Sequence, residues 1–304
     1  MHNDRHVCSA EERQMARPQD ADTYLIDSNE EMVRLERQAA IYGAHDDLAH
    51  LALKGTEVVL DAGCGAGAIT RTIARALPSG HVVGLDREPR FVDYARRKAE
   101  ADDVSNTEFT TGDVLSLPFG DAHFDVVWSK HLLQWVAKRE QAIKEFVRVT
   151  KPGGRVIAVN FDGFMLQHYP QNPQVQADLE RWFDDARVQM GFDNWMGRKL
   201  PTMFRNAGLT DIRVDTMPDK AYSGLGGDAE RLWNMRVQWE ATREFSAKVF
   251  GSHHAAIDVM KRTLDCFGDP GIYFHCTMFY VEGCVPPEFG NAGPPSTSAD
   301  LRLA

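Results

Sequence analysis

Hydrophobic and polar positions follow two different periods between residues 57 and 161. Short apolar runs predict five buried strands, which are Glu57–Asp61, His81–Asp86, Thr107–Thr111, Phe124–Ser129 and Arg155–Phe161. Between the strands, apolar residues recur every three or four positions, as at Ile69, Ile73 and Leu77, and this spacing predicts amphipathic helices. An alternation of strands and helices favours a parallel sheet covered by helices on both faces. The pattern therefore predicts an α/β fold.

The flanking segments have patterns of their own. Ser28 and Glu31 form a capping box ahead of helically spaced apolar residues. Beyond residue 161 the spacing predicts helices from Val175 to Ala186, from Leu200 to Gly208 and within residues 228–267, and strands at Thr210–Thr216 and Ile272–Val281. We expect a mobile arm over residues 1–22, cap helices over 23–54, a main domain over 55–285 with helical lid insertions at about 162–208 and 218–270, and a disordered tail over 286–304.

Composition and charge narrow the function. The net charge of −10 argues against a protein that holds nucleic acid through phosphate contacts. No apolar run approaches the roughly 18 residues that span a bilayer, and the first 22 residues lack the apolar stretch of a secretory signal. The five cysteines are an odd number without a C-x-x-C pair, so we expect reduced thiols, no zinc site and a cytoplasmic protein.

Residues 58–70 read V-V-L-D-A-G-C-G-A-G-A-I-T, and Gly63 to Ala68 fit the dinucleotide fingerprint G-x-G-x-x-G/A. Asp61, two residues before Gly63, would repel the pyrophosphate of a dinucleotide in a poorly solvated site. A cationic nucleoside is favoured instead, and S-adenosylmethionine (SAM) fits that description. Asp86 ends the next strand and could accept ribose hydroxyls, but nicotinamide enzymes place an acid there too.

The order VVLDAGCGAG, VVGLD, GDVLSLPF, FDVVWS, EFVRVTKPGG resembles the class I SAM-dependent methyltransferases. The resemblance is close over about residues 55–160 and looser to 283. It implies a Rossmann-like fold with a seven-stranded, mostly parallel sheet whose last strand is antiparallel. It also implies SAM as methyl donor and S-adenosylhomocysteine as product.

Carried over position by position, the resemblance assigns cofactor contacts to the ends of the first four strands. They are Asp61, Gly63, Cys64, Gly65 and Gly67 around the methionine part, Asp86 and Arg87 at the ribose, Asp113 and Val114 at the adenine, and Ser129 at the sulfonium. The alternatives are a tight turn without ligand for the loop, a turn cap for Asp113 and a small spacer for Cys64. Lys130 would oppose a sulfonium, so we expect its ammonium to point away or to pair with an acid.

The segment YLIDSNEEMVRLERQAAIYG resembles the N-terminal helix that closes over SAM in small-molecule methyltransferases. Arg34 and Gln38 are four residues apart on one face of this helix, and Arg34 could pair with the methionine carboxylate. Tyr24 could reach the methyl-transfer site. The alternatives are an exposed surface pair for Arg34 and Gln38 and an aromatic anchor for Tyr24.

Candidate catalytic and substrate residues rest on location. His131 follows the fourth strand, and His168 and Tyr169 follow the fifth, so either histidine could act as a base, although a purely structural histidine is more common. Trp195 and Trp239 lie in the lid segments, where aromatic side chains suit an apolar acceptor or simply fill a core.

These features predict a SAM-dependent methyltransferase that acts on oxygen, nitrogen or carbon of a small molecule with apolar or aromatic parts. Specialised metabolism or a quinone-like pathway is the expected setting. No metal, nucleic acid or membrane span is expected, and the N-terminal arm could support a homo-oligomer. Two alternatives remain open: an NAD(P)-dependent oxidoreductase, and a methyltransferase-like cyclase or isomerase that uses SAM structurally or couples C-methylation to cyclisation.

Overall fold

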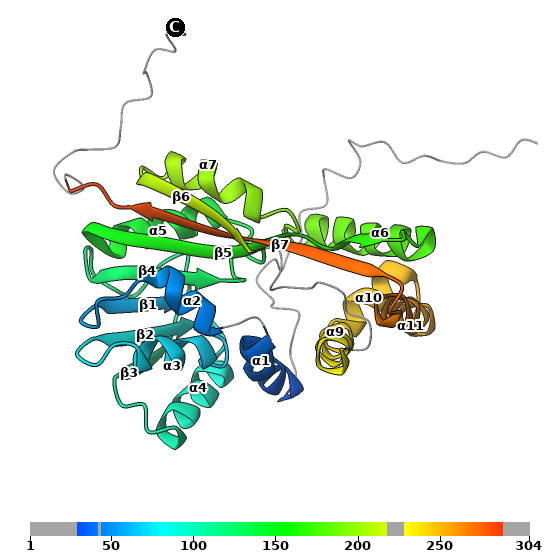
Figure 1. Cartoon of the computed structure of the whole chain (residues 1–304), viewed down its shortest axis with the longest axis horizontal. Coiled ribbons are helices and arrows are strands. Elements are labelled where there is room, and N and C mark those ends of the chain that lie inside the picture. Colours follow the sequence, from blue (N-terminus) through cyan, green and yellow to red (C-terminus); the bar gives the residue numbers. More distant parts are fainter. Residues whose placement is uncertain (1–28, 42–43, 218–227, 288–304) are drawn as a thin grey trace, which may run out of the picture.

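The computed structural model describes residues 29–41, 44–217 and 228–287. Its centre is a seven-stranded sheet in the order β3-β2-β1-β4-β5-β7-β6 (Figure 1). The strands are β1 (Val58–Ala62), β2 (His81–Asp86), β3 (Thr107–Thr111), β4 (Phe124–Lys130), β5 (Thr150–Tyr169), β6 (Thr210–Met217) and β7 (Tyr273–Cys284). β1 to β5 pair in parallel, whereas β7 runs antiparallel to both β5 and β6. The predicted sheet with an antiparallel last strand is confirmed.

One strand is much longer than predicted. The apolar pattern predicted Arg155–Phe161, but β5 extends over Thr150–Tyr169. The outer part of β5 lacks a continuous ladder, and its pairing shifts between Asp162 and Gln167. Backbone hydrogen bonds to β7 hold this outer part in place, and such bonds leave no hydrophobic period in the sequence.

The helices alternate with the strands in the first half and gather in the second. They are α1 (Asn29–Ile41), α2 (Ala44–Leu51), α3 (Ala68–Arg75), α4 (Pro89–Ala101), α5 (Arg139–Val149), α6 (Pro173–Met190), the short η2 (Gly197–Lys199), α7 (Leu200–Asn206), α9 (Ala229–Ala241), α10 (Arg243–Phe250) and α11 (His253–Gly268). The predicted helical stretch 228–267 is therefore three helices, with a break at Thr242 and another at the left-handed Gly251.

Alternate residues of the central strands enter two separate cores. Val59 and Trp128 face a core that contains Ile73 of α3. Leu60 and Val127 face the opposite core with α5 and α7. A strand that sends successive side chains to opposite faces must be covered on both faces, which explains the layered arrangement.

Helices α6, α9, α10 and α11 form a layer at one end of the sheet, and we call this layer the lid (Figure 1). β5 and β7 continue past the sheet as a two-stranded ribbon that reaches α6, α10 and α11 (Figure 1). Apolar residues of α6, α9, α10 and α11 join the first core, including Trp182, Trp239 and Phe245. The lid is thus packed onto the sheet domain and shares its hydrophobic core.

Helix α1 lies between the sheet and α9 (Figure 1), and it contacts both α3 and α9. Glu36 accepts two hydrogen bonds from the Arg71 guanidinium of α3, both at 2.8 Å. The expected cap residue Ser28 lies outside the described residues. Its proposed partner Glu31 instead binds Arg34 through both carboxylate oxygens, at 2.6 Å each.

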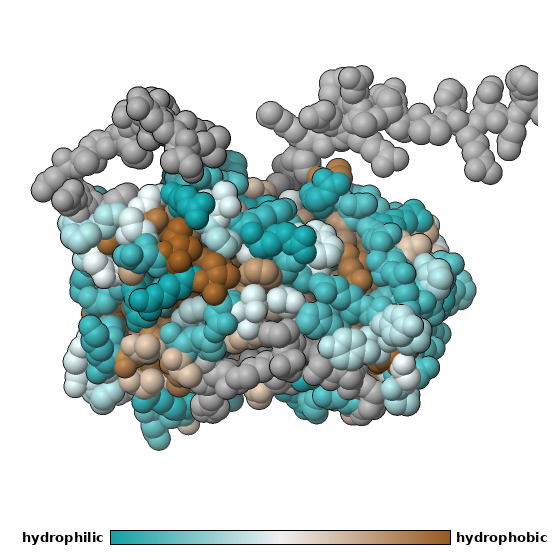
Figure 2. Space-filling view, turned by 45° about the horizontal axis from the view of Figure 1, so that its top comes forward, coloured by the Kyte–Doolittle hydropathy of each residue, from teal (hydrophilic) through white to brown (hydrophobic). Residues whose placement is uncertain are grey.

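The surface is largely hydrophilic, with apolar side chains gathered in a few patches on the face that Figure 2 shows. Among the described residues, no helix is both long and apolar enough to cross a membrane. The expected arm over residues 1–22, residues 218–227 and the part of the expected tail from residue 288 onward lie outside the described residues.

Candidate functional site

The carboxyl ends of β1, β2, β3 and β4 meet at one edge of the sheet, and a cleft of about 280 Å³ opens there. We call it the main cleft. Its walls come from the segments that follow these four strands, from α1 on one side, and from Phe161, Met190 and Gln238 on the other. Ligands of open α/β sheets bind at this edge, and the volume is close to the lower end, about 300 Å³, of small-molecule sites.

The glycine loop after β1 forms one wall of the main cleft. Gly63 has a φ of 78° and Gly67 a φ of 74°, a left-handed conformation that favours glycine. A Cβ at Gly63 would lie 2.8 Å from Leu132, and one at Gly67 would lie 2.7 Å from Ala95. The glycines therefore let the loop turn tightly. Gly63, Cys64 and Gly65 line the cleft, whereas Gly67 faces Ala95 and Phe109 and does not line it. Burial raises the pKa of the Cys64 thiol, which fits the spacer interpretation.

Asp86 at the end of β2 organises this loop and also lines the cleft. Its two carboxylate oxygens accept the backbone N–H groups of Gly65 at 2.9 Å and Glu88 at 3.0 Å. Each carboxylate oxygen has a second lone pair, so the carboxylate can also accept ligand hydroxyls. Burial raises the pKa of Asp86. Arg87 lines the cleft beside it.

Asp61 takes a different position from the one expected. It lies 3% exposed behind the loop, accepts a 2.6 Å hydrogen bond from Thr70 Oγ1, and does not line the main cleft. Burial, together with the nearby charge of Asp86, raises the pKa of Asp61 to about 7, although the hydrogen bond from Thr70 acts in the opposite direction. Asp61 can therefore act on a ligand only indirectly, through the helix and loop that it holds.

Asp113 and Val114 line the cleft beyond β3. Asp113 Oδ1 accepts the N–H of Leu115 at 2.9 Å, so the turn-cap geometry is present together with a place in the cleft wall. The two interpretations are compatible, because a carboxylate has acceptor sites to spare.

The residues after β4 divide between cleft and core. Ser129 is fully buried, does not line the cleft, and its hydroxyl has no hydrogen-bond partner among the described residues. Lys130 donates to Asp47 of α2 at 2.6 Å, which confirms that its ammonium pairs with an acid. His131 lines the cleft with a φ of 56°, a strained conformation for a residue with a side chain. Burial lowers the pKa of His131 to about 3, so its imidazole is neutral.

Arg34 and Gln38 of α1 both line the cleft. Arg34 is only 3% exposed and is held by Glu31 and by Asn234 of α9, whose Oδ1 it reaches at 3.1 Å. The alternative interpretation, in which Arg34 is an exposed residue at the surface, therefore does not hold. The charge of Arg34 is already matched by Glu31, so it would meet a ligand carboxylate as part of an ion-pair network.

Three further candidates lie away from the cleft. His168 is buried on the outer part of β5 against Phe267, and it accepts the N–H of Asn172 at 3.2 Å. Tyr169 is 75% exposed, and the Trp195 ring is covered by the Arg198 guanidinium. None of the three lines the main cleft. Tyr24 lies outside the described residues.

Trp239 lines a second cavity, which we call the aromatic pocket and which adjoins the main cleft. The pocket has a volume of about 30 Å³, and Trp135 and Gln238 line both it and the main cleft. Its other walls come from the lid and β5. They are Thr242 and the apolar or aromatic residues Phe164, Met165, Leu179, Trp182, Phe183, Phe192, Met235 and Trp239.

The sequence interpretation missed several cleft residues. Gln134 and Trp135 follow the fourth strand by four and five positions, and their place at a strand's carboxyl end could have indicated them. Gln238 had no such signal, because only packing of the lid brings α9 to the sheet. Within the described part of the chain, no group of His, Cys, Asp and Glu has the arrangement of a metal site.

Comparison with known proteins agrees with this geometry. Residues 60–158 match the family model of a methyltransferase domain. Over 135 residues the chain is 33% identical to a demethylmenaquinone methyltransferase of Lactobacillus johnsonii, covering 44% of this chain and 53% of that protein. The chain spans about half the length of the curated relatives it matches, this one included.

Solved structures share the fold at lower identity. Phosphoethanolamine N-methyltransferase 2 of Haemonchus contortus, in complex with S-adenosylhomocysteine, is 18% identical with a TM-score of 0.53, covering 82% of this chain and 56% of that one. The [4+2]-cyclase SpnF is 20% identical with a TM-score of 0.53, covering 82% of each chain. Residues 60–158 therefore form a methyltransferase domain, and the described chain has the Rossmann-like fold of the class I methyltransferases.

Proposed function

We propose that the protein transfers a methyl group from SAM to a small-molecule acceptor held in the aromatic pocket. One observation carries this proposal: the segments after β1, β2, β3 and β4 line a single cleft that opens into an aromatic pocket under the lid. A nucleoside in the cleft and an apolar acceptor in the pocket would meet at Trp135 and Gln238, which border both.

The residues of the cleft fit SAM in chemistry. Asp86 offers acceptors to ribose hydroxyls, and Asp113 and Val114 offer an acceptor and backbone groups to the adenine. Gly63, Gly65 and the α1 residues Arg34 and Gln38 would surround the methionine part. Bound there, SAM would supply an electrophilic methyl group.

The charges beside the cleft favour a cation over a pyrophosphate. Asp86 lies next to the loop, while Lys130 and Arg34 are already matched by Asp47 and Glu31. Arg87 and Lys138 also line the cleft. A pyrophosphate bound at the glycine loop would face Asp86 without a free cation from Lys130 or Arg34, which supports SAM over the nicotinamide alternative.

The chain's own contribution is positioning and exclusion of water. α1 and the lid close over the cleft from two sides, and the aromatic walls exclude water from an acceptor. His131 is a weak base, because its pKa is lowered to about 3, so at neutral pH its imidazole donates or accepts a hydrogen bond without holding an extra proton. His168 lies too far into the ribbon core to be part of this proposal. The acceptor therefore has to present its own electron pair.

The wider setting is proposed on composition. An acceptor with apolar or aromatic parts suits specialised metabolism or a quinone-like pathway, and a quinone-type acceptor is named for the relative from Lactobacillus johnsonii. We also propose a cytoplasmic location, since the described cysteines, Cys64, Cys266, Cys276 and Cys284, are all free thiols. A homo-oligomer formed through residues 1–22 stays a proposal.

Calorimetric titration with S-adenosylhomocysteine, with NADH in parallel, tests the cofactor. We expect micromolar binding of the nucleoside and no signal from NADH. Asp86→Ala should weaken the binding of S-adenosylhomocysteine at least tenfold, because a buried hydrogen bond to a charged group contributes about 1.5–3 kcal/mol. Glu108→Gln, an exposed change on β3, is the control and should bind normally. Binding of NADH alone would overturn the proposal.

The cyclase alternative makes a different prediction for product analysis. A methyltransferase releases one S-adenosylhomocysteine for each acceptor converted, whereas a protein that uses SAM structurally converts acceptor without releasing it. The likeness to SpnF concerns the fold alone at 20% identity. Conversion of an acceptor without S-adenosylhomocysteine release would favour the cyclase over methyl transfer.

A further inference from the structure

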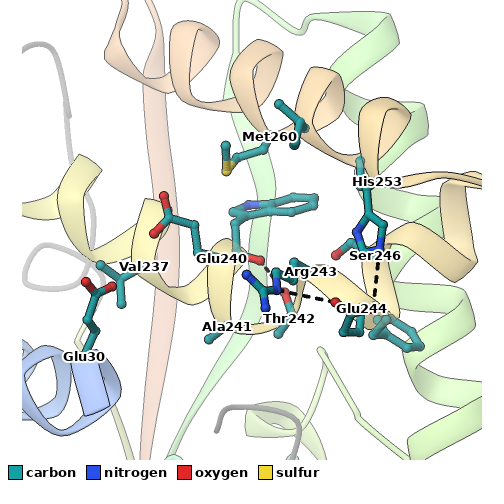
Figure 3. A pocket seen from close by; sticks show the side chains of 14 residues that line it. Glu30, Val237, Glu240, Ala241, Thr242, Arg243, Glu244, Ser246, His253 and Met260 are labelled. Carbon is teal, nitrogen blue, oxygen red and sulfur yellow. Dashed lines mark hydrogen bonds and ion pairs between the residues drawn. The ribbon is translucent and has the colours of Figure 1, made fainter. Parts of the chain in front are cut away.

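A third cavity, which we call the outer groove, lies among α9, α10 and α11, with Glu30 of α1 at one end (Figure 3). Its volume is about 640 Å³, more than twice the 280 Å³ of the main cleft. Trp239, Phe245, Ile257 and Met260 supply apolar surface. A cavity of this volume is in the range that holds small organic ligands.

The three cavities share walls in series. Trp135 and Gln238 border both the main cleft and the aromatic pocket, and Trp239 and Thr242 border both the aromatic pocket and the outer groove. The aromatic pocket, at about 30 Å³, has room for only a few water-sized groups. An acceptor larger than that must extend beyond the pocket, and the outer groove is the adjoining space on the side away from the cofactor residues.

The rim of the groove carries an excess of negative charge. Three carboxylates, Glu30, Glu240 and Glu244, line it together with one guanidinium, that of Arg243. Arg243 lies 3.4 Å from Glu244, whose other oxygen lies 3.5 Å from His253.

The other two carboxylates of the rim differ from each other. Arg236, which does not line the groove, binds Glu240 at 2.9 Å. Glu30 makes no ion pair with any described residue. Even with Arg236 counted, one negative charge is left over, and the one lining guanidinium is already engaged. The potential in the groove therefore favours a cation over an anion.

Resting on the proposed methyl transfer, we propose that the outer groove is a second subsite for the acceptor. It takes an apolar segment that carries an amine protonated at neutral pH, while the part to be methylated lies in the aromatic pocket. Trp239, 8% exposed, separates the two subsites and must move aside when one molecule occupies both. The acceptor class is thus an amphipathic amine with a distant apolar or aromatic end.

The test uses the full chain saturated with S-adenosylhomocysteine and three probes titrated by calorimetry. Phenylhexylamine carries a ring and a distant ammonium, phenylhexanol is its neutral match, and phenethylamine is too short to span two cavities. We expect phenylhexylamine to bind about fivefold tighter than phenylhexanol, as for a partly exposed ion pair, and tighter than phenethylamine.

Two variants test whether the preference for the ammonium over the alcohol arises in the outer groove. Glu30→Gln and Glu240→Gln should each reduce the preference for the ammonium over the alcohol, whereas Glu108→Gln, on the opposite edge of the sheet, should leave it unchanged. Equal binding of the ammonium and the alcohol, or a preference that survives both variants, would overturn the outer subsite. Failure of S-adenosylhomocysteine to bind at the start would instead overturn the proposed function.

Discussion

At the scale of single residues, the site depends on two buried groups whose protonation is shifted in opposite senses. Asp61 has its pKa raised to about 7 and His131 has its pKa lowered to about 3, and burial is the largest cause of both shifts. Both groups are therefore neutral in the folded protein over a range in which they are charged in the unfolded chain. Each shift makes stability depend on pH, and the two dependences partly cancel.

Asp61→Asn should reveal the first dependence. Between its ordinary pKa of 3.8 and the folded value of about 7, folded Asp61 keeps a proton that the unfolded chain has lost, so the free energy of unfolding falls as pH rises through this range. The variant lacks this loss. Relative to wild type it should gain stability from pH 5 to pH 7, by up to about 1.4 kcal/mol per pH unit. Urea unfolding at several pH values measures the stability difference between variant and wild type. A difference that does not change with pH would contradict the raised pKa of Asp61.

His131→Asn should show the reverse. The unfolded chain binds a proton at this position below the ordinary value of 6.5, whereas the folded protein does so only near 3, so wild type loses stability as pH falls through this range. The free energy of unfolding of the variant, relative to wild type, should therefore increase as pH is lowered from about 6.5 to 5. Asparagine also tolerates the φ of 56° better than most residues. Urea unfolding at several pH values measures this difference. A stability of the variant that increases, relative to wild type, toward high pH would refute the prediction.

At the scale of elements, the break in β5 decides where the lid sits. Gly163 has a φ of 75°, and its N–H donates to the Asn194 carbonyl at 2.8 Å instead of continuing the ladder. A Cβ at Gly163 would lie 2.6 Å from the Trp195 ring. The ribbon that supports α6 and α11 begins just beyond this point, so the geometry of the break is transmitted to the lid.

Gly163→Ala and Gly153→Ala form a matched pair. Both glycines have a φ near 75°, but a Cβ at Gly153 meets nothing within 4 Å. We expect Gly153→Ala to cost about 1–2 kcal/mol from backbone strain alone. Gly163→Ala should cost clearly more, since it adds the clash with Trp195. Thermal or urea unfolding compares the stabilities of the two variants. Equal losses of stability would mean that the contact with Trp195 does not contribute to the cost of Gly163→Ala.

At the scale of the whole molecule, α1 connects the cofactor residues to the lid. It binds α3 through Glu36 and Arg71 and α9 through Arg34 and Asn234, and it borders the main cleft in between. A ligand in the cleft therefore contacts an element that is tied to both parts of the molecule.

Hydrogen exchange with and without S-adenosylhomocysteine tests this coupling. We expect slower exchange in α1, in residues 63–67 and in α9, because a ligand bound to the folded state suppresses opening of the elements it contacts. The edge strand β6 is an internal control, since it lies at the far side of the sheet, and only the general gain in stability should reach it. Protection confined to α11 and the ribbon would contradict the placement of the nucleoside.

The sequence alone determined the sheet and the cofactor loop. The strands β2 and β3 occupy the predicted residues, and Gly63, Gly65, Asp86 and Asp113 line one cleft as their positions after strands imply. Both rest on short-range signals: a run of apolar residues reports burial on two faces, and the carboxyl ends of parallel strands necessarily meet at one edge.

Only the tertiary structure decided what surrounds that edge. In the folded chain Asp61 is buried and does not line the main cleft, and His168, Tyr169 and Trp195 also lie outside it. Gln238 of α9 lines the main cleft, and Trp239 lines the adjoining aromatic pocket. Helical spacing shows that a face is buried but not against what, since any apolar partner satisfies the same pattern. Which lid residues face the acceptor depends on packing between segments more than a hundred residues apart, and such packing leaves no local period in the chain.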